Sequence, residues 1–154
     1  MEKIPEVEAA KTLMTEAVSW SVMKWLREKK RVRKTADQAN AALDHLNQAV
    51  KDRWPERVRV AYASLVTQGR CNAILPGQPT PPPPAIDLPS KLSAKKVKEA
   101  DDAAYRARMD AEDTFDEAER QLSTSIAREG CRKAIQSWEL HEKAIRRAEA
   151  FLPQ

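Results

Sequence analysis

Apolar side chains recur every three or four residues through the first third of the chain, which places them on one face of an α-helix. The steps alternate as in a coiled-coil seam, interrupted by Lys11, by Lys29 and by one slip between Val18 and Val22. Such a slip is typical of a stutter, which locally unwinds a supercoil. The seam consists of Ile4, Val7, Met14, Val18, Val22, Trp25, Val32, Ala36, Ala39, Leu43, Leu46 and Val50.

This seam predicts a first helix over residues 4–53, which would be about 75 Å long if unbroken. A break near Thr35 is the alternative, because the segment from Thr35 to Gln38 has the sequence of a capping box. Proline restricts the backbone of the residue before it, so Pro55 ends this helix and suits the first turn of the next. The second predicted helix covers residues 56–75.

Residues 76–89 are rich in proline and predict a stiff polyproline II linker. An alanine-rich stripe then predicts a third helix over residues 91–152, with Gly130 as the alternative position for a kink or short turn. The second helix and the linker together are nearly as long as the first helix. We therefore expect the linker to bring the chain back to its starting end, so that the third helix runs parallel to the first.

The sequence thus predicts an all-α fold in one domain over residues 1–154. We expect an elongated helical bundle with coiled-coil-like packing of three long helices, or four if one of them breaks. The chain has only three glycines, and it lacks the glycine-rich motifs that bind dinucleotides, cradle phosphates or carry a nucleophilic serine. We predict no enzymatic activity, no catalytic residues and no cofactor.

Composition and charge agree with a helical, globular protein. Hydrophobic residues make up 42% of the chain and charged residues 32%, which is too apolar for a disordered chain. The sequence shows no apolar leader and no run near the ~18 apolar residues that cross a membrane. Cys71 and Cys131 lack the spacing of a metal site. We expect a cytoplasmic protein with reduced thiols, although a single disulfide is compatible with the sequence.

The two histidines do not predict a metal centre. Di-iron helical bundles use Glu-x-x-His pairs, but Ala42 precedes His45 by three residues and Trp138 precedes His141 by three. We predict no metal site. His141 lies on an apolar stripe, so we expect it in the core or at its rim, whereas His45 should face solvent.

The strongest local signal is a run of cations over residues 24–34, opposed within it by Glu28 alone. Such a cluster fits the phosphates of a nucleic acid, or an anionic membrane surface with tryptophan at the interface. The candidate binding patch is Trp20, Lys24, Arg27, Lys30, Arg31, Arg33 and Lys34.

An acidic run over residues 110–119 offers an internal alternative. If the first and third helices are parallel with an offset of about 86 residues, Arg31 lies beside Glu117, and the two runs pair within the chain or across a dimer. We expect this internal matching to reduce the affinity of the basic run for polyanions, although a merely solvated charged face is a further alternative.

The function that the sequence favours is a non-enzymatic interaction or scaffold protein. Its partner would be a protein or a second copy of itself, because long apolar seams are typical of helices that form homo-oligomers. The alternative is a protein that binds nucleic acid or an anionic membrane surface through residues 24–34.

Overall fold

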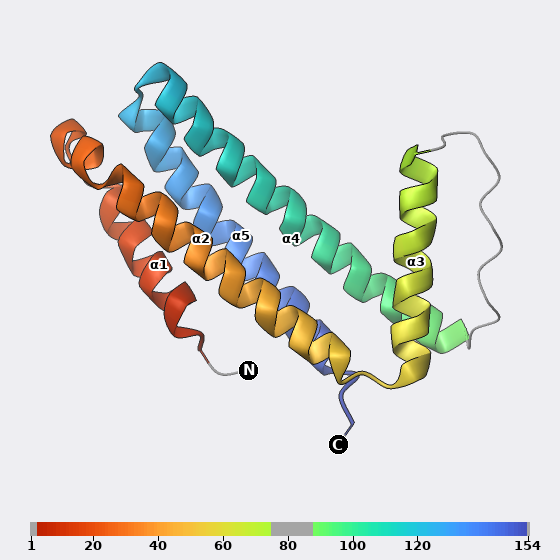
Figure 1. Cartoon of the computed structure of the whole chain (residues 1–154). Helices are drawn as coiled ribbons and strands as arrows, with labels where there is room; N and C mark the ends of the chain where they lie inside the picture. Colours follow the sequence, from red (N-terminus) through yellow and green to blue (C-terminus); the bar gives the residue numbers. More distant parts are fainter. Residues whose placement is uncertain (1–2, 75–87, 154) are drawn as a thin grey trace.

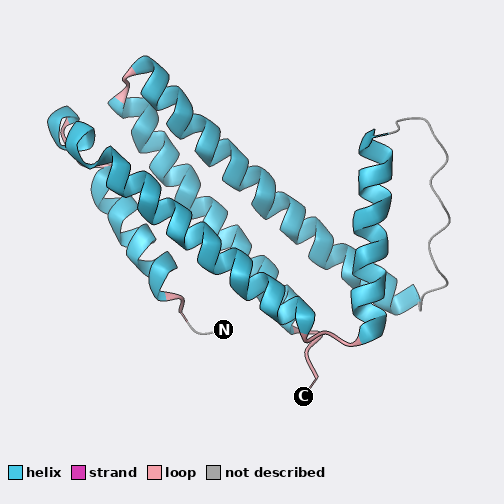
Figure 2. Ribbon diagram, viewed as in Figure 1, coloured by secondary structure: helices cyan, strands magenta, loops and turns pink. Residues whose placement is uncertain are grey.

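The computed structural model of the chain describes residues 3–74 and 88–153. Regular structure in these residues is entirely helical, as Figure 2 shows, so the predicted all-α bundle is confirmed. The helices are more numerous than predicted, and their bounds are α1 Pro5–Ala17, α2 Val22–Asp52, α3 Glu56–Ile74, α4 Leu88–Gln121 and α5 Thr124–Glu149.

The predicted single helix over residues 4–53 is wrong, because the chain turns between α1 and α2. α1 ends at Ala17, and Ser21 then caps α2 by accepting a hydrogen bond from the backbone N–H of Lys24 (3.2 Å). α1 folds back along α2 (Figure 1), so the slip in the apolar seam marks a reversal of the chain and not a stutter. The alternative break near Thr35 does not occur, since α2 is continuous there.

The predicted single helix over residues 91–152 is also wrong, because α4 and α5 form a hairpin joined by two residues. Ser123 N–H donates to the carbonyl of Ala118 (3.0 Å) and Leu122 N–H to that of Glu119 (3.3 Å). This pair of bonds is a Schellman motif, in which the residue in the position of Leu122 takes a left-handed conformation. Leu122 has φ 50°, and the side chain of Ser123 caps α5.

The remaining boundaries are close to the predicted ones. α3 matches the predicted helix over residues 56–75 to within one residue. α4 begins at Leu88, so Pro89 belongs to its first turn, where the missing N–H of proline costs little. The rest of the predicted linker, residues 76–87, lies outside the described residues.

α5 is the central helix of the bundle. It packs along α4 over most of its length, and it also contacts α2 and α1, whereas α3 packs mainly against α4 and stands away from the other helices (Figure 1). α2 and α5 run parallel: Asn40 of α2 bonds Trp138, and Trp54, just after α2, bonds the backbone of Ala148. α4 runs antiparallel to both. The predicted parallel arrangement therefore applies to α5 alone.

Small side chains allow α4 and α5 to pack closely. Many of the buried residues of α4 and α5 are alanine, which lets two helix backbones approach. Gly130 is the extreme case, because a Cβ atom there would lie 2.9 Å from Cδ1 of Phe115. Phe115 in turn stacks on Trp25 of α2, with ring centroids 6.4 Å apart. Gly130 is thus a packing residue inside a continuous helix, and the alternative of a kink or short turn there does not occur.

We predict that Gly130→Ala destabilises the protein by about 1–3 kcal/mol, because the gain in helix propensity is smaller than the cost of overpacking against Phe115. Gly69→Ala is the matched control, since its added Cβ would meet only the end of Lys98 at 3.8 Å. This control should gain up to ~1 kcal/mol. Chemical denaturation of both variants measures the difference, and equal effects would show that the contact with Phe115 is not constraining.

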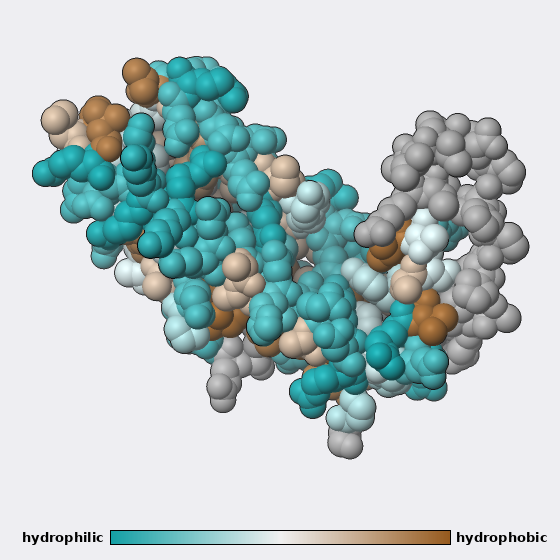
Figure 3. All heavy atoms as spheres, in the orientation of Figure 1, coloured by the Kyte–Doolittle hydropathy of each residue, from teal (hydrophilic) through white to brown (hydrophobic). Residues whose placement is uncertain are grey.

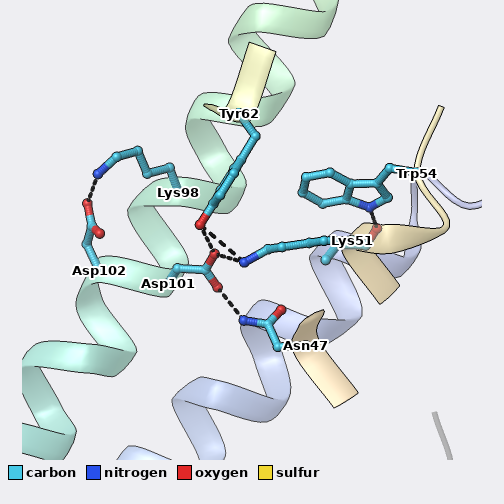
Figure 4. Close-up of polar contacts among 8 residues, drawn as sticks. Asn47, Lys51, Trp54, Tyr62, Lys98, Asp101 and Asp102 are labelled. Carbon is cyan, nitrogen blue, oxygen red and sulfur yellow. Dashed lines mark hydrogen bonds and ion pairs between the residues drawn. The ribbon is translucent and has the colours of Figure 1, made fainter. Parts of the chain in front are cut away.

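A partly buried polar junction fixes α3 to the bundle (Figure 4). Asp101 of α4 accepts hydrogen bonds from Lys51 of α2 (2.5 Å), from Tyr62 of α3 (2.6 Å) and from Asn47 (3.3 Å). The side chains of Lys51 and Asp101 are each 13% exposed. Burial and the hydrogen bond to Asp101 raise the pKa of Tyr62 above its usual value, so the phenol keeps its proton and donates. One carboxylate thus joins three helices.

An aromatic corner around Trp54, at the turn that follows α2, packs beside the same junction. Trp54 is buried, and its indole N–H donates to the carbonyl of Ala148 at 2.7 Å. Its ring makes edge contacts with Tyr62 and with Phe151, at centroid distances of 5.5 and 5.9 Å. The turn between α2 and α3 is therefore held against the end of α5.

We predict that Asp101→Ala costs about 1.5–3 kcal/mol of unfolding free energy, because it leaves the partly buried Lys51 and Tyr62 without their shared charged acceptor. Asp102→Ala is the control at the next position, since the pair Lys98–Asp102 is partly exposed and contributes ~0.5 kcal/mol. The double variant Lys51→Met/Asp101→Leu should recover much of the loss. A loss for Asp101→Ala no larger than that for Asp102→Ala would contradict the role of Asp101 in joining three helices.

Candidate binding face

The predicted patch divides between the surface and the interior. Five of its cations lie exposed on the first four turns of α2, and we call these residues the basic face: Lys24, Arg27, Lys30, Arg31 and Lys34. Arg31 pairs with Glu28 of the same helix at 3.4 Å. The other four have no carboxylate partner among the described residues. The basic face is therefore a largely uncompensated cationic surface.

Two members of the predicted patch are turned inward. Trp20 is buried in the turn before α2, where its ring lies 6.3 Å from that of Trp25. Its carbonyl accepts a hydrogen bond from Arg128 of α5 (3.0 Å). Arg33 pairs with Asp116 of α4 at 2.9 Å and lies over the ring of Phe115. Trp20 therefore covers neighbouring helices, and Arg33, whose side chain is 33% exposed, bridges α2 to α4.

Within the chain, the predicted pairing of the basic and acidic runs is wrong in direction and in register. Ion pairs bridge α2 and α4 in antiparallel order: Arg33–Asp116 (2.9 Å), Asp44–Arg108 (2.8 Å) and Lys51–Asp101 (2.5 Å). Arg31 does not reach Glu117, which instead bonds Arg120 and Gln121 of its own helix. In the described part of the chain, Arg33–Asp116 is the one ion pair between the two runs.

Large apolar side chains are exposed at the end of the molecule where α2 begins and α4 turns into α5. Figure 3 shows brown atoms at this end, among teal ones. The side chains that lie here are Val22 (55% exposed), Met23 (68%), Leu26 (45%) and Leu122 (77%), and we call them the apolar tip. Sequence reasoning placed Val22 in the buried seam and missed the other three.

The helical repeat shows how the tip and the basic face are arranged on α2. Leu26 lies two turns before Arg33, so both are on the side of α2 that faces α4. Met23 lies one turn before Arg27 and two before Lys30, so it continues the basic face to the end of the helix. The antiparallel register puts Leu122 of the α4–α5 turn at the same level as Leu26. Met23 and the cations of the basic face thus share one side of α2, and the other residues of the apolar tip lie at the same end of the bundle.

The interior between α2, α4 and α5 contains a cavity of about 180 Å³, and its lining mixes charged and apolar side chains. The charged ones are two arginines and two carboxylates: Arg33, Arg108, Asp37 and Glu112. Each arginine is paired with an aspartate that lies outside this lining. We assign no ligand to this cavity, and the basic face remains the candidate site.

His141 is buried beside this interior, as predicted for a core or rim histidine, and His45 is exposed as predicted. Burial lowers the pKa of His141 to about 4, and the positive charge of Arg108 acts in the same direction. Asp44, Asp101 and a hydrogen bond to the backbone of Ala104 oppose this shift. His141 is therefore neutral in the folded protein at neutral pH.

We predict that stability falls as pH drops from about 6.5 to about 4. In this range the unfolded chain binds a proton at residue 141 and the folded chain does not, so acid favours unfolding by up to roughly 3 kcal/mol. His141→Gln should flatten this part of the pH profile. His45→Gln, at an exposed position, should leave it unchanged. Parallel profiles for wild type and His141→Gln would rule out a buried neutral imidazole.

No protein-family model, curated protein or solved structure matches the chain. In the described ranges, no helix is both long and apolar enough to span a membrane. The assignment of function therefore depends on the chemistry of the exposed side chains.

Proposed function

We propose that the protein is a non-enzymatic helical interaction module whose basic face binds a polyanionic partner. The observation that carries this proposal is the exposure of Lys24, Arg27, Lys30 and Lys34 without an ion-pair partner in the described structure. Like charges on neighbouring turns repel one another, so such a cluster lowers stability unless an external anion compensates it.

Self-association through the apolar seam is less well supported. Val7, Met14, Val32, Ala39 and Leu43 of that seam are buried inside one chain. They are therefore occupied by contacts among α1, α2 and α5. The apolar tip has four residues, far fewer than the roughly 20–30 that each partner contributes to a stable interface, and two basic faces repel each other. A polyanion fits the exposed surface better than a second copy.

We predict that the protein binds immobilised heparin and that neutralising the basic face abolishes most of this retention. The test variant is Lys24→Gln/Arg27→Gln/Lys30→Gln/Lys34→Gln. The control makes the same change in formal charge with exposed cations of α3 and α4, namely Arg57→Gln/Arg59→Gln/Lys95→Gln/Lys96→Gln. The salt concentration at elution is the measurement, because each cation that leaves the contact weakens the salt dependence.

Only the test variant should elute at markedly lower salt. Equal shifts in both variants would mean that heparin senses net charge and not a site. No retention of the wild type would contradict the proposal. Circular dichroism of the three proteins confirms that the comparison is made between folded chains.

A further inference from the structure

The apolar tip distinguishes between the polyanions that the basic face would bind. A nucleic acid presents phosphates and gives no reason to expose Val22, Met23, Leu26 and Leu122 beside the cations. An anionic bilayer presents phosphates above hydrocarbon, so it receives both kinds of side chain at once. We infer that the partner is an anionic phospholipid membrane, with the apolar tip inserted among the lipids and the basic face against the headgroups. This inference rests on the proposed function.

The conformation of Leu122 is an independent observation in favour of insertion. Its φ of 50° is left-handed, a conformation that glycine or asparagine adopts at lower cost than leucine. The side chain makes little compensating contact within the chain, since it is 77% exposed. The turn thus presents an apolar side chain to the outside at a cost to the fold, and a lipid environment explains that arrangement.

Neither the basic face nor the apolar tip is sufficient by itself to hold the protein stably on a membrane. One Lys or Arg near an anionic bilayer raises binding roughly fivefold, and stable attachment of a peripheral protein needs a second, apolar contribution. Met23 continues the stripe of Arg27, Lys30 and Lys34, so one orientation of α2 brings both contributions to the surface. The interaction is peripheral, through one end of the bundle.

The experiment uses the whole chain and vesicle sedimentation. Wild type should bind vesicles of phosphatidylcholine with about one-third phosphatidylserine, should bind pure phosphatidylcholine vesicles far less, and should dissociate as salt is raised. The test variant is Met23→Ser/Leu122→Gly, in which glycine suits the left-handed turn and removes the inserted side chain. Val60→Ser/Met109→Ser is the control, because Val60 and Met109 are also exposed but lie away from the tip.

The test variant should bind anionic vesicles about tenfold or more weakly than wild type, while its elution from heparin and its thermal stability are maintained. The control should bind as wild type does. Unchanged vesicle binding by the test variant would overturn the insertion of the tip. If wild type is retained on heparin and binds labelled duplex RNA but not anionic vesicles, the membrane inference fails while the proposed function stands. Loss of heparin specificity for the basic face would overturn both.

Discussion

The close approach of α4 and α5 is the constraint on which the rest of the bundle depends. Gly130 leaves room for the ring of Phe115, and that ring supports Trp25 and lies under the guanidinium of Arg33. Both of those contacts belong to α2, so the position of α2 follows from the spacing of the other two helices. The end of α2 that carries the basic face is thereby fixed relative to the α4–α5 turn.

Periodicity alone predicted the helical class and the faces that are buried, because stripes such as Val32, Ala36 and Ala39 lie on one side of a helix whatever its length. It did not predict where helices end. Ser21 is an ordinary capping residue, and with the slip at Val22 it was sufficient to indicate a turn. The turn at Leu122 also has a capping residue, Ser123, but it lacks the glycine or asparagine that usually marks the left-handed position.

The sequence predicted the cations of the candidate site, but it did not predict which side chains lie around them. The cluster of lysine and arginine is visible in the sequence, but its freedom from carboxylates depends on the direction of α4. That direction follows from the hairpin between α4 and α5. Because this hairpin was not predicted, the predicted register of the basic and acidic runs was wrong. The inward position of Trp20 and the exposure of Met23 and Leu26 likewise depend on how the first turn of α2 is placed against α5.

The attachment of α3 has a consequence for the dynamics of the protein. α3 packs mainly against α4 and is joined to α2 through Lys51 and the corner at Trp54. Opening this one contact region exposes much less apolar surface than separating α4 from α5. α3 should therefore unfold locally at a free energy below that of global unfolding, and its amide hydrogens should exchange with solvent before those of the α4–α5 hairpin. The chain then has two cooperative units, and the one that contains the α4–α5 hairpin unfolds at the higher free energy.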